Sequence, residues 1–81
     1  NKEEKNEVDF LVIKENKPWF LVEVKRQETS ITPTLNYFQE QLKAPFAFQV
    51  VINSDYIDRN CFTKPRSALV VPAKTLLSQL L

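Results

Sequence analysis

Three charged residues stand at the ends of two apolar segments and form the most informative pattern in the chain. Asp9 lies near the start of the first segment, and Glu23 and Lys25 lie at the end of the second. A charge inside a strand that is buried on both faces is strongly destabilising unless it is paired or bound to a cation. Two carboxylates and a lysine are also groups that serve metal-assisted phosphodiester hydrolysis. The pattern therefore predicts a catalytic metal site.

Two strands are predicted to position these residues. Segments Val8–Lys14 and Pro18–Lys25 are rich in Val, Ile, Leu and aromatic residues, as strands are. The link Glu15–Lys17 between them is short enough for a tight hairpin, and Asn16 tolerates left-handed backbone geometry.

The register of this hairpin decides whether the charges meet. A three-residue turn pairs Lys14 with Pro18, which places Asp9 opposite Glu23 with Cβ atoms about 5 Å apart. Side chains alternate between the faces of a strand, so Asp9, Glu23 and Lys25 are predicted to share one face. The other odd positions on that face are Leu11, Ile13, Trp19 and Leu21, and the even face is apolar from Val8 to Val24.

A divalent cation would explain two carboxylates placed opposite each other, since like charges there destabilise a sheet. Mg²⁺ typically takes one or two carboxylates with waters and a phosphate oxygen. We expect Asp9, Glu23 and the backbone carbonyl of Val24 to bind Mg²⁺, or Mn²⁺ in its place. Lys25 would orient or deprotonate the attacking water, or stabilise the pentavalent phosphorus. The alternative is that all three are solvated strand-end charges, with Lys25 paired to either acid.

A helix is predicted after the hairpin. Thr32 is a good N-cap and Pro33 a good first helical residue. Pro45 ends the helix, because the residue before a proline disfavours helical geometry. The predicted apolar positions, at helical spacing, are Leu35, Phe38 and Leu42.

The remaining segments complete an α/β fold. Phe46–Ile52 is predicted as a third strand, residues 53–66 as a polar connection, and Ser67–Val71 as a short fourth strand. Pro72 opens a closing helix whose apolar stripe consists of Leu76, Leu77, Leu80 and Leu81. The predicted fold is a small mixed sheet with flanking helices, in the order β-β-α-β-β-α.

Composition limits the other possibilities. The 81 residues fit one domain, spanning 1–81, and the chain contains no Gly, so turns with positive φ are expected to use Asn or Asp. The single Cys61 allows no internal disulfide, which suits a cytoplasmic protein, and with no His it excludes a structural zinc site. No segment is long enough to span a membrane.

The net charge of +1 gives no information about partners, but the basic residues are unevenly spread. From Arg59 to Leu81 the chain has four basic residues and no acidic one. Arg59, Lys64 and Arg66 are therefore candidate contacts to nucleic-acid phosphates. The alternative is an ordinary solvated surface.

The two charged segments resemble a known nuclease superfamily. Glu7-Val-Asp-Phe and the later Leu-Val-Glu-Val-Lys are similar to the PD-(D/E)xK motif of the restriction-endonuclease-like fold. The resemblance implies that Asp9, Glu23 and Lys25 are the catalytic residues, although Val8 stands where the family has proline. It also implies a further acidic residue on a preceding helix. Glu7 shares the odd face with Asp9 and is a candidate supporting acid, with a solvated charge as the alternative. Relatives sometimes place a polar helix residue toward the site, here Gln39 or Gln41.

Nearly the whole chain also resembles the C-terminal end of an uncharacterised domain attached to prokaryotic AAA-type ATPases. The similar segments are Glu7-Val-Asp-Phe-Leu, Leu21-Val-Glu-Val-Lys and Leu69-Val-Val-Pro-Ala. The resemblance implies an upstream ATPase domain in cis, which would bind ATP. We expect the chain to be the C-terminal part of a longer nuclease-like domain, inactive on its own. The apolar hairpin likewise predicts that a further helix or a partner packs on it.

Three functions are consistent with these patterns. The first is Mg²⁺-dependent hydrolysis of DNA or RNA. The second is a non-catalytic docking or dimerisation module of the ATPase, in which the chain would form a homo-oligomer. The third is binding of nucleic acid without cleavage, through the basic C-terminal part.

Overall fold

The structure is a computed structural model and describes residues 8–81. Its elements are β1 (Phe10–Lys14), β2 (Lys17–Lys25), α1 (Pro33–Leu42), β3 (Phe46–Val51), β4 (Ala68–Pro72) and α2 (Ala73–Ser78). The four strands form one sheet in the order β1-β2-β3-β4. β1 runs antiparallel to β2, whereas β2, β3 and β4 are parallel. The predicted α/β class, mixed sheet and element order are confirmed.

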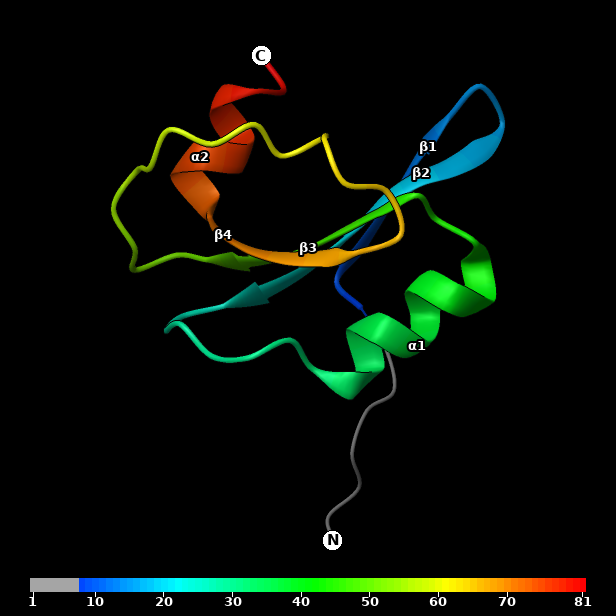
Figure 1. Cartoon of the computed structure of the whole chain (residues 1–81), viewed down its shortest axis with the longest axis horizontal. Coiled ribbons are helices and arrows are strands. Elements are labelled where there is room, and N and C mark those ends of the chain that lie inside the picture. Colours follow the sequence, from blue (N-terminus) through cyan, green and yellow to red (C-terminus); the bar gives the residue numbers. More distant parts are fainter. Residues whose placement is uncertain (1–7) are drawn as a thin grey trace, which may run out of the picture.

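The sheet separates two apolar clusters (Figure 1). α1 covers one face, where Leu21, Leu35 and Ala47 are completely buried. α2 and the connection between β3 and β4 cover the other face. The larger cluster lies there and is built around Phe20, Phe48, Val50, Val71 and Leu76. The sheet is thus the middle layer of three, and each of its faces has a different cover.

The hairpin turn differs from the prediction. It contains two residues, Glu15 and Asn16, both with left-handed φ (54° and 65°), and Lys14 pairs with Lys17. This is the preferred hairpin geometry, because left-handed turns match the strand twist. The predicted three-residue turn is therefore wrong.

A β-bulge in β2 restores the predicted register beyond the turn. Val12 pairs with Phe20 while Ile13 pairs with Pro18, so one extra residue, Trp19, is inserted in β2. The two-residue turn and the bulge cancel each other. Phe10 consequently pairs with Val22, the partner that the three-residue turn also gives.

The bulge also changes the face of Trp19. The prediction placed Trp19 on the odd face with Glu23, but its ring stacks on Phe62 at 5.2 Å and contacts Phe20 on the other face. A bulge interrupts the strict alternation of side chains, which explains the error. The Lys14 ammonium lies 4.6 Å from the centre of the Trp19 ring and adds a cation–π contact.

The outer strand β1 exposes apolar side chains. Phe10, Leu11 and Ile13 are 59%, 40% and 52% exposed. Neither α1 nor α2 reaches over the tip of the hairpin (Figure 1). Within residues 8–81, nothing covers these side chains, and the expectation of a further helix or partner there stays a prediction.

The connection between β3 and β4 is more ordered than its polar sequence predicts. The Thr75 hydroxyl accepts from the Ile57 N–H (2.9 Å) and donates to the Ile57 carbonyl (2.8 Å). The Gln79 side chain accepts from the Cys61 N–H (2.9 Å) and donates to the carbonyl of Arg59. Cys61 is buried as a result. The side chains of the α2 region therefore fix this connection over the sheet.

The predicted leucine stripe of the closing helix is largely wrong. α2 is short, and of the four leucines only Leu76 is buried, whereas Leu77, Leu80 and Leu81 are exposed. Thr75 takes a core position because its hydroxyl is satisfied by the connection. No helix in the described part of the chain has the length and apolar character needed to cross a membrane.

Candidate functional site

Asp9 is bonded to the backbone of β2 at the point where β1 begins. The ladder starts at Phe10, and the Asp9 N–H donates to the Val22 carbonyl at 3.1 Å. The Asp9 carboxylate accepts a hydrogen bond from the Val24 N–H at 2.7 Å. A residue fifteen positions away is thus attached to the residue between Glu23 and Lys25.

This arrangement corrects the predicted cross-strand pair. Asp9 lies in a bend outside the ladder, so it has no regular partner in Glu23. Val8, predicted on the even face, packs with Leu21 and Leu35 on the α1 side instead. The bend interrupts the alternation that the parity argument assumed. Asp9 is thus linked to the Glu23–Lys25 segment through the backbone of Val24, rather than by facing Glu23 across the hairpin.

Glu23 and Lys25 lie side by side near the end of β2. Glu23 Oε2 is 3.5 Å from Lys25 Nζ, and the two side chains are 13% and 35% exposed. Glu23 Oε1 accepts a hydrogen bond from the Thr32 hydroxyl at 2.6 Å. The alternative prediction that Lys25 pairs with an acid holds for Glu23. A partly exposed pair of this kind contributes only about 0–1 kcal/mol, so it does not explain the cluster as a stabilising device.

Gln49 of β3 is a central residue that the sequence reasoning missed. It pairs with Glu23 in the parallel ladder and is completely buried. Its amide nitrogen donates to the carbonyls of Thr29 and Ser30 at 3.0 and 2.9 Å. Its amide oxygen accepts from the Thr32 N–H at 3.0 Å. A polar side chain inside an apolar strand needs such partners, and that rule would have singled out Gln49.

Thr32 joins α1 to the candidate site. Its hydroxyl accepts from the Leu35 N–H at 3.2 Å, which caps the helix as predicted, and donates its proton to Glu23. A hydroxyl has one donor and two acceptor positions, so both bonds form at once. The orientation of the Glu23 carboxylate is therefore linked to the start of α1.

Replacing Thr32 with Val is expected to lower the free energy of unfolding by about 1–2 kcal/mol, because both hydroxyl bonds are lost. Thr32→Ser keeps the hydroxyl and should stay within about 0.5 kcal/mol of the parent. Urea unfolding followed by circular dichroism measures both changes. Thr34→Val, the same change two residues along α1, is the matched control. A Thr32→Val loss no larger than that of Thr34→Val would show that the cap bonds are unimportant.

The Val24 carbonyl shares the side of β2 that Asp9 occupies. The N–H and C=O of one strand residue point to the same side of the strand, and the Val24 N–H is bonded to Asp9. The predicted ligands Asp9 and Val24 are therefore neighbours. Within residues 8–81, no group of three His, Cys, Asp or Glu side chains gathers as a metal cage. Two carboxylates with one carbonyl still suit Mg²⁺, which keeps several of its waters.

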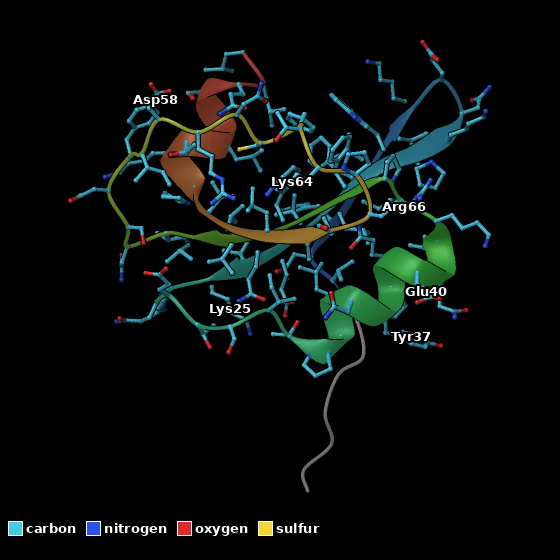
Figure 2. All side chains as sticks on the ribbon, in the orientation of Figure 1. Lys25, Tyr37, Glu40, Asp58, Lys64 and Arg66 are labelled. Carbon is cyan, nitrogen blue, oxygen red and sulfur yellow. The ribbon has the colours of Figure 1, made fainter. Side chains whose placement is uncertain are left out.

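The predicted nucleic-acid contacts do not form one surface. Arg59 lines a pocket at the carboxyl ends of β3 and β4, beside Glu28 and Asp55. Arg66 precedes β4 and lines a different pocket, near the end of α1. Figure 2 shows Arg66 and Lys25 near opposite ends of α1, and Lys64 on the α2 side of the sheet. Arg59 and Arg66 thus lie at opposite ends of β4, although they are close in sequence.

The other candidate residues have structural roles or lie outside the described part. Gln39 is buried, and its amide donates to the carbonyls of Ala44 and Pro45. It therefore supports the end of α1 rather than the site. Glu7 lies outside the residues that the structure describes. Burial raises the pKa of the Cys61 thiol, against smaller lowering effects of Gln79 and Arg59, which disfavours the nucleophilic thiolate.

The comparisons with known proteins give no match. No protein-family model matches the chain. No curated protein and no solved structure matches it either. The resemblance to the PD-(D/E)xK superfamily accordingly stays a prediction, and a functional proposal depends on the geometry described above.

Proposed function

We propose that the chain contributes a divalent-cation site for phosphodiester hydrolysis of nucleic acid. The observation that carries this proposal is the hydrogen bond between the Asp9 carboxylate and the Val24 N–H. It brings the isolated acid to the Glu-Val-Lys segment, where Glu23 and Lys25 already lie 3.5 Å apart. Two carboxylates, a carbonyl and an ammonium group then share one end of the β1–β2 pair.

Each group has a separate role in the proposal. Asp9, Glu23 and the Val24 carbonyl would hold Mg²⁺ or Mn²⁺. When bound, the cation would supply a water of lowered pKa and offset charge on the phosphate. Lys25, at 35% exposure, reaches solvent beside Glu23 and is placed to orient a water or to bind a phosphate oxygen. Thr32 and Gln49 hold the Glu23 carboxylate and the adjoining loop in place.

Calorimetric titration with Mn²⁺ tests the ligands. Asp9→Asn and Glu23→Gln are each expected to weaken binding at least about tenfold, since each removes a negative ligand. Asp55→Asn and Glu28→Gln make the same changes at the pocket that Arg59 lines, away from the proposed ligands. These variants should bind Mn²⁺ like the parent. Lys25→Met should keep or strengthen Mn²⁺ binding, because it removes a neighbouring positive charge, while abolishing any hydrolysis of labelled DNA or RNA.

Two results would contradict the proposal. One is a parent chain that does not bind Mn²⁺ at millimolar concentration. The other is unchanged affinity in both carboxylate variants. Either result would leave a non-catalytic module, the second candidate, which the exposed Phe10, Leu11 and Ile13 on the outer strand favour.

A further inference from the structure

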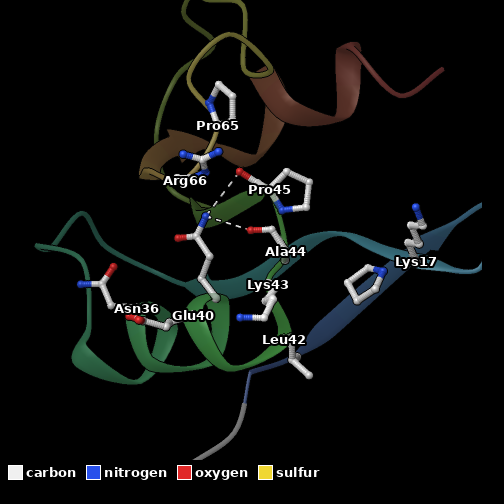
Figure 3. A pocket seen from close by; sticks show the side chains of 11 residues that line it. Lys17, Asn36, Glu40, Leu42, Lys43, Ala44, Pro45, Pro65 and Arg66 are labelled. Carbon is white, nitrogen blue, oxygen red and sulfur yellow. Dashed lines mark hydrogen bonds between the residues drawn. The ribbon is translucent and has the colours of Figure 1, made fainter.

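A basic pocket of about 960 Å³ lies at the other end of β2 from Glu23 and Lys25 (Figure 3). Its walls come from the hairpin tip, the last turns of α1, the start of β3 and the residues before β4. The charged residues among them are Lys17, Lys43, Arg66 and Glu40. Three cations and one acid from three separate parts of the chain thus meet in one place.

The backbone of this pocket is already fixed. The Gln39 amide donates to the Ala44 carbonyl (3.2 Å) and the Pro45 carbonyl (3.4 Å), as the dashed lines in Figure 3 show. The Arg66 N–H donates to the same Pro45 carbonyl at 2.7 Å. Three of the lining residues are prolines, Pro18, Pro45 and Pro65. A ligand would therefore meet a preformed wall and would have little backbone to order.

The positive charge of the pocket is not neutralised within the described residues. Within residues 8–81, none of Lys17, Lys43 and Arg66 has a carboxylate oxygen within 4.0 Å. The ion pair in this part of the chain joins Lys25 to Glu23, which lie outside the pocket. The carboxyl end of α1 adds a partial negative charge of about half a unit. The last helical carbonyls are capped by the N–H groups of Lys43 and Ala44. The balance favours an anionic ligand.

Two of the basic residues have backbone angles that glycine adopts most easily. Lys43 and Arg66 have left-handed φ of 54° and 71°, where a residue with a Cβ atom is less stable than Gly. The expectation that Asn or Asp would fill such positions holds only at Asn16. The chain contains no glycine, and Glu15 also has left-handed φ, so these positions hold larger side chains throughout.

We propose that this pocket binds phosphates of a nucleic-acid backbone without reading its bases. Long cationic side chains act as separate point charges, which suits several phosphates along a strand. A single phosphate is usually bound by convergent backbone N–H groups at a helix N-terminus, and α1 presents its carboxyl end here. Among residues 8–81, no aromatic side chain lines the pocket, so this wall offers no surface on which a base would stack. The binding does not depend on the proposed hydrolysis.

Anisotropy of a labelled DNA duplex, measured in EDTA over a series of KCl concentrations, tests this pocket. In the triple variant Lys17→Ala, Lys43→Gly and Arg66→Gly, affinity at low salt should fall at least about tenfold, and the salt slope by about 3. The two glycine changes should raise the melting temperature, because they relieve the left-handed positions. Loss of binding would then be separated from loss of folding.

A second triple variant with the same net charge is the control. Arg59→Ala, Lys64→Ala and Lys74→Ala removes three cations outside the pocket and should leave most of the affinity. An equal loss in both triples would overturn the proposal. Competition by inorganic phosphate at fixed ionic strength would overturn it as well, because the site would then bind free phosphate.

A charge reversal at Glu40 tests the same pocket without removing any of its basic residues. Glu40→Lys adds a cation to the pocket and should tighten binding and raise the salt slope by about 1. Glu28→Lys makes the same change beside the other pocket and should gain less. Equal gains in the two variants would contradict the assignment.

Discussion

Phe48→Ala is expected to lower the free energy of unfolding by about 3–5 kcal/mol. The Phe48 side chain is 1% exposed and makes edge contacts with Phe20 and Phe62, at ring-centre distances of 5.5 and 5.2 Å. It also stacks parallel to Phe46. Truncation removes this apolar area and leaves a cavity that the surrounding sheet fills only in part. A domain of this size has a total stability of about 4–12 kcal/mol, so the expected loss is a large fraction of that stability.

Urea unfolding followed by circular dichroism measures this loss. Phe10→Ala is the matched control, because Phe10 is 59% exposed and the same truncation there should change stability by less than about 1 kcal/mol. Phe48→Leu retains most of the volume and should fall between the two. Equal effects of Phe48→Ala and Phe10→Ala would mean that the aromatic cluster is not the core.

Replacing Gln49 with Leu is expected to lower the free energy of unfolding by about 3 kcal/mol. The change keeps the buried volume but removes three hydrogen bonds, to the carbonyls of Thr29 and Ser30 and from the Thr32 N–H. These backbone groups would lose their partner beside the sheet. The effect extends to the candidate site, because Thr32 also holds Glu23.

Gln41→Leu supplies the control for this second change, since Gln41 is exposed on α1 and the substitution is chemically identical. Urea unfolding should separate the two variants, and hydrogen exchange should be faster at Thr32 in Gln49→Leu. Mn²⁺ affinity should fall too, because Glu23 is less constrained. A Gln49→Leu protein as stable as Gln41→Leu would refute this account of Gln49.

The order of the elements was predictable because it depends on local patterns. Nearly continuous runs of Val, Ile, Leu and aromatic residues define β1 and β2, and Thr32 with Pro33 marks the start of α1. Glu23 and Lys25 were predictable for a similar reason, since charges in an apolar strand need a partner. The same rule applied to Gln49 would have predicted its buried hydrogen bonds.

Other features depend on contacts between distant segments. The bulge at Trp19 is stabilised by Phe62, more than forty residues away, and no local pattern near Trp19 marks it. The bend at Asp9 depends on its bond to Val24. The basic pocket joins the hairpin tip to Arg66, so a search for basic residues close in sequence found Arg66 but missed Lys17 and Lys43.

The bulge at Trp19 has a consequence for how this hairpin tolerates insertion and deletion during evolution. Because the extra residue is accommodated locally, loss of position 19 would remove the Trp19 packing but leave Phe10 opposite Val22. Loss of a residue between Phe20 and Glu23 would instead turn Glu23 to the opposite face of the sheet. The number of residues that separate Asp9 from Glu23 can therefore change at the bulge without moving Glu23 to the other face. A motif search that fixes the spacing between Asp9 and Glu23 would miss relatives that lack the bulge.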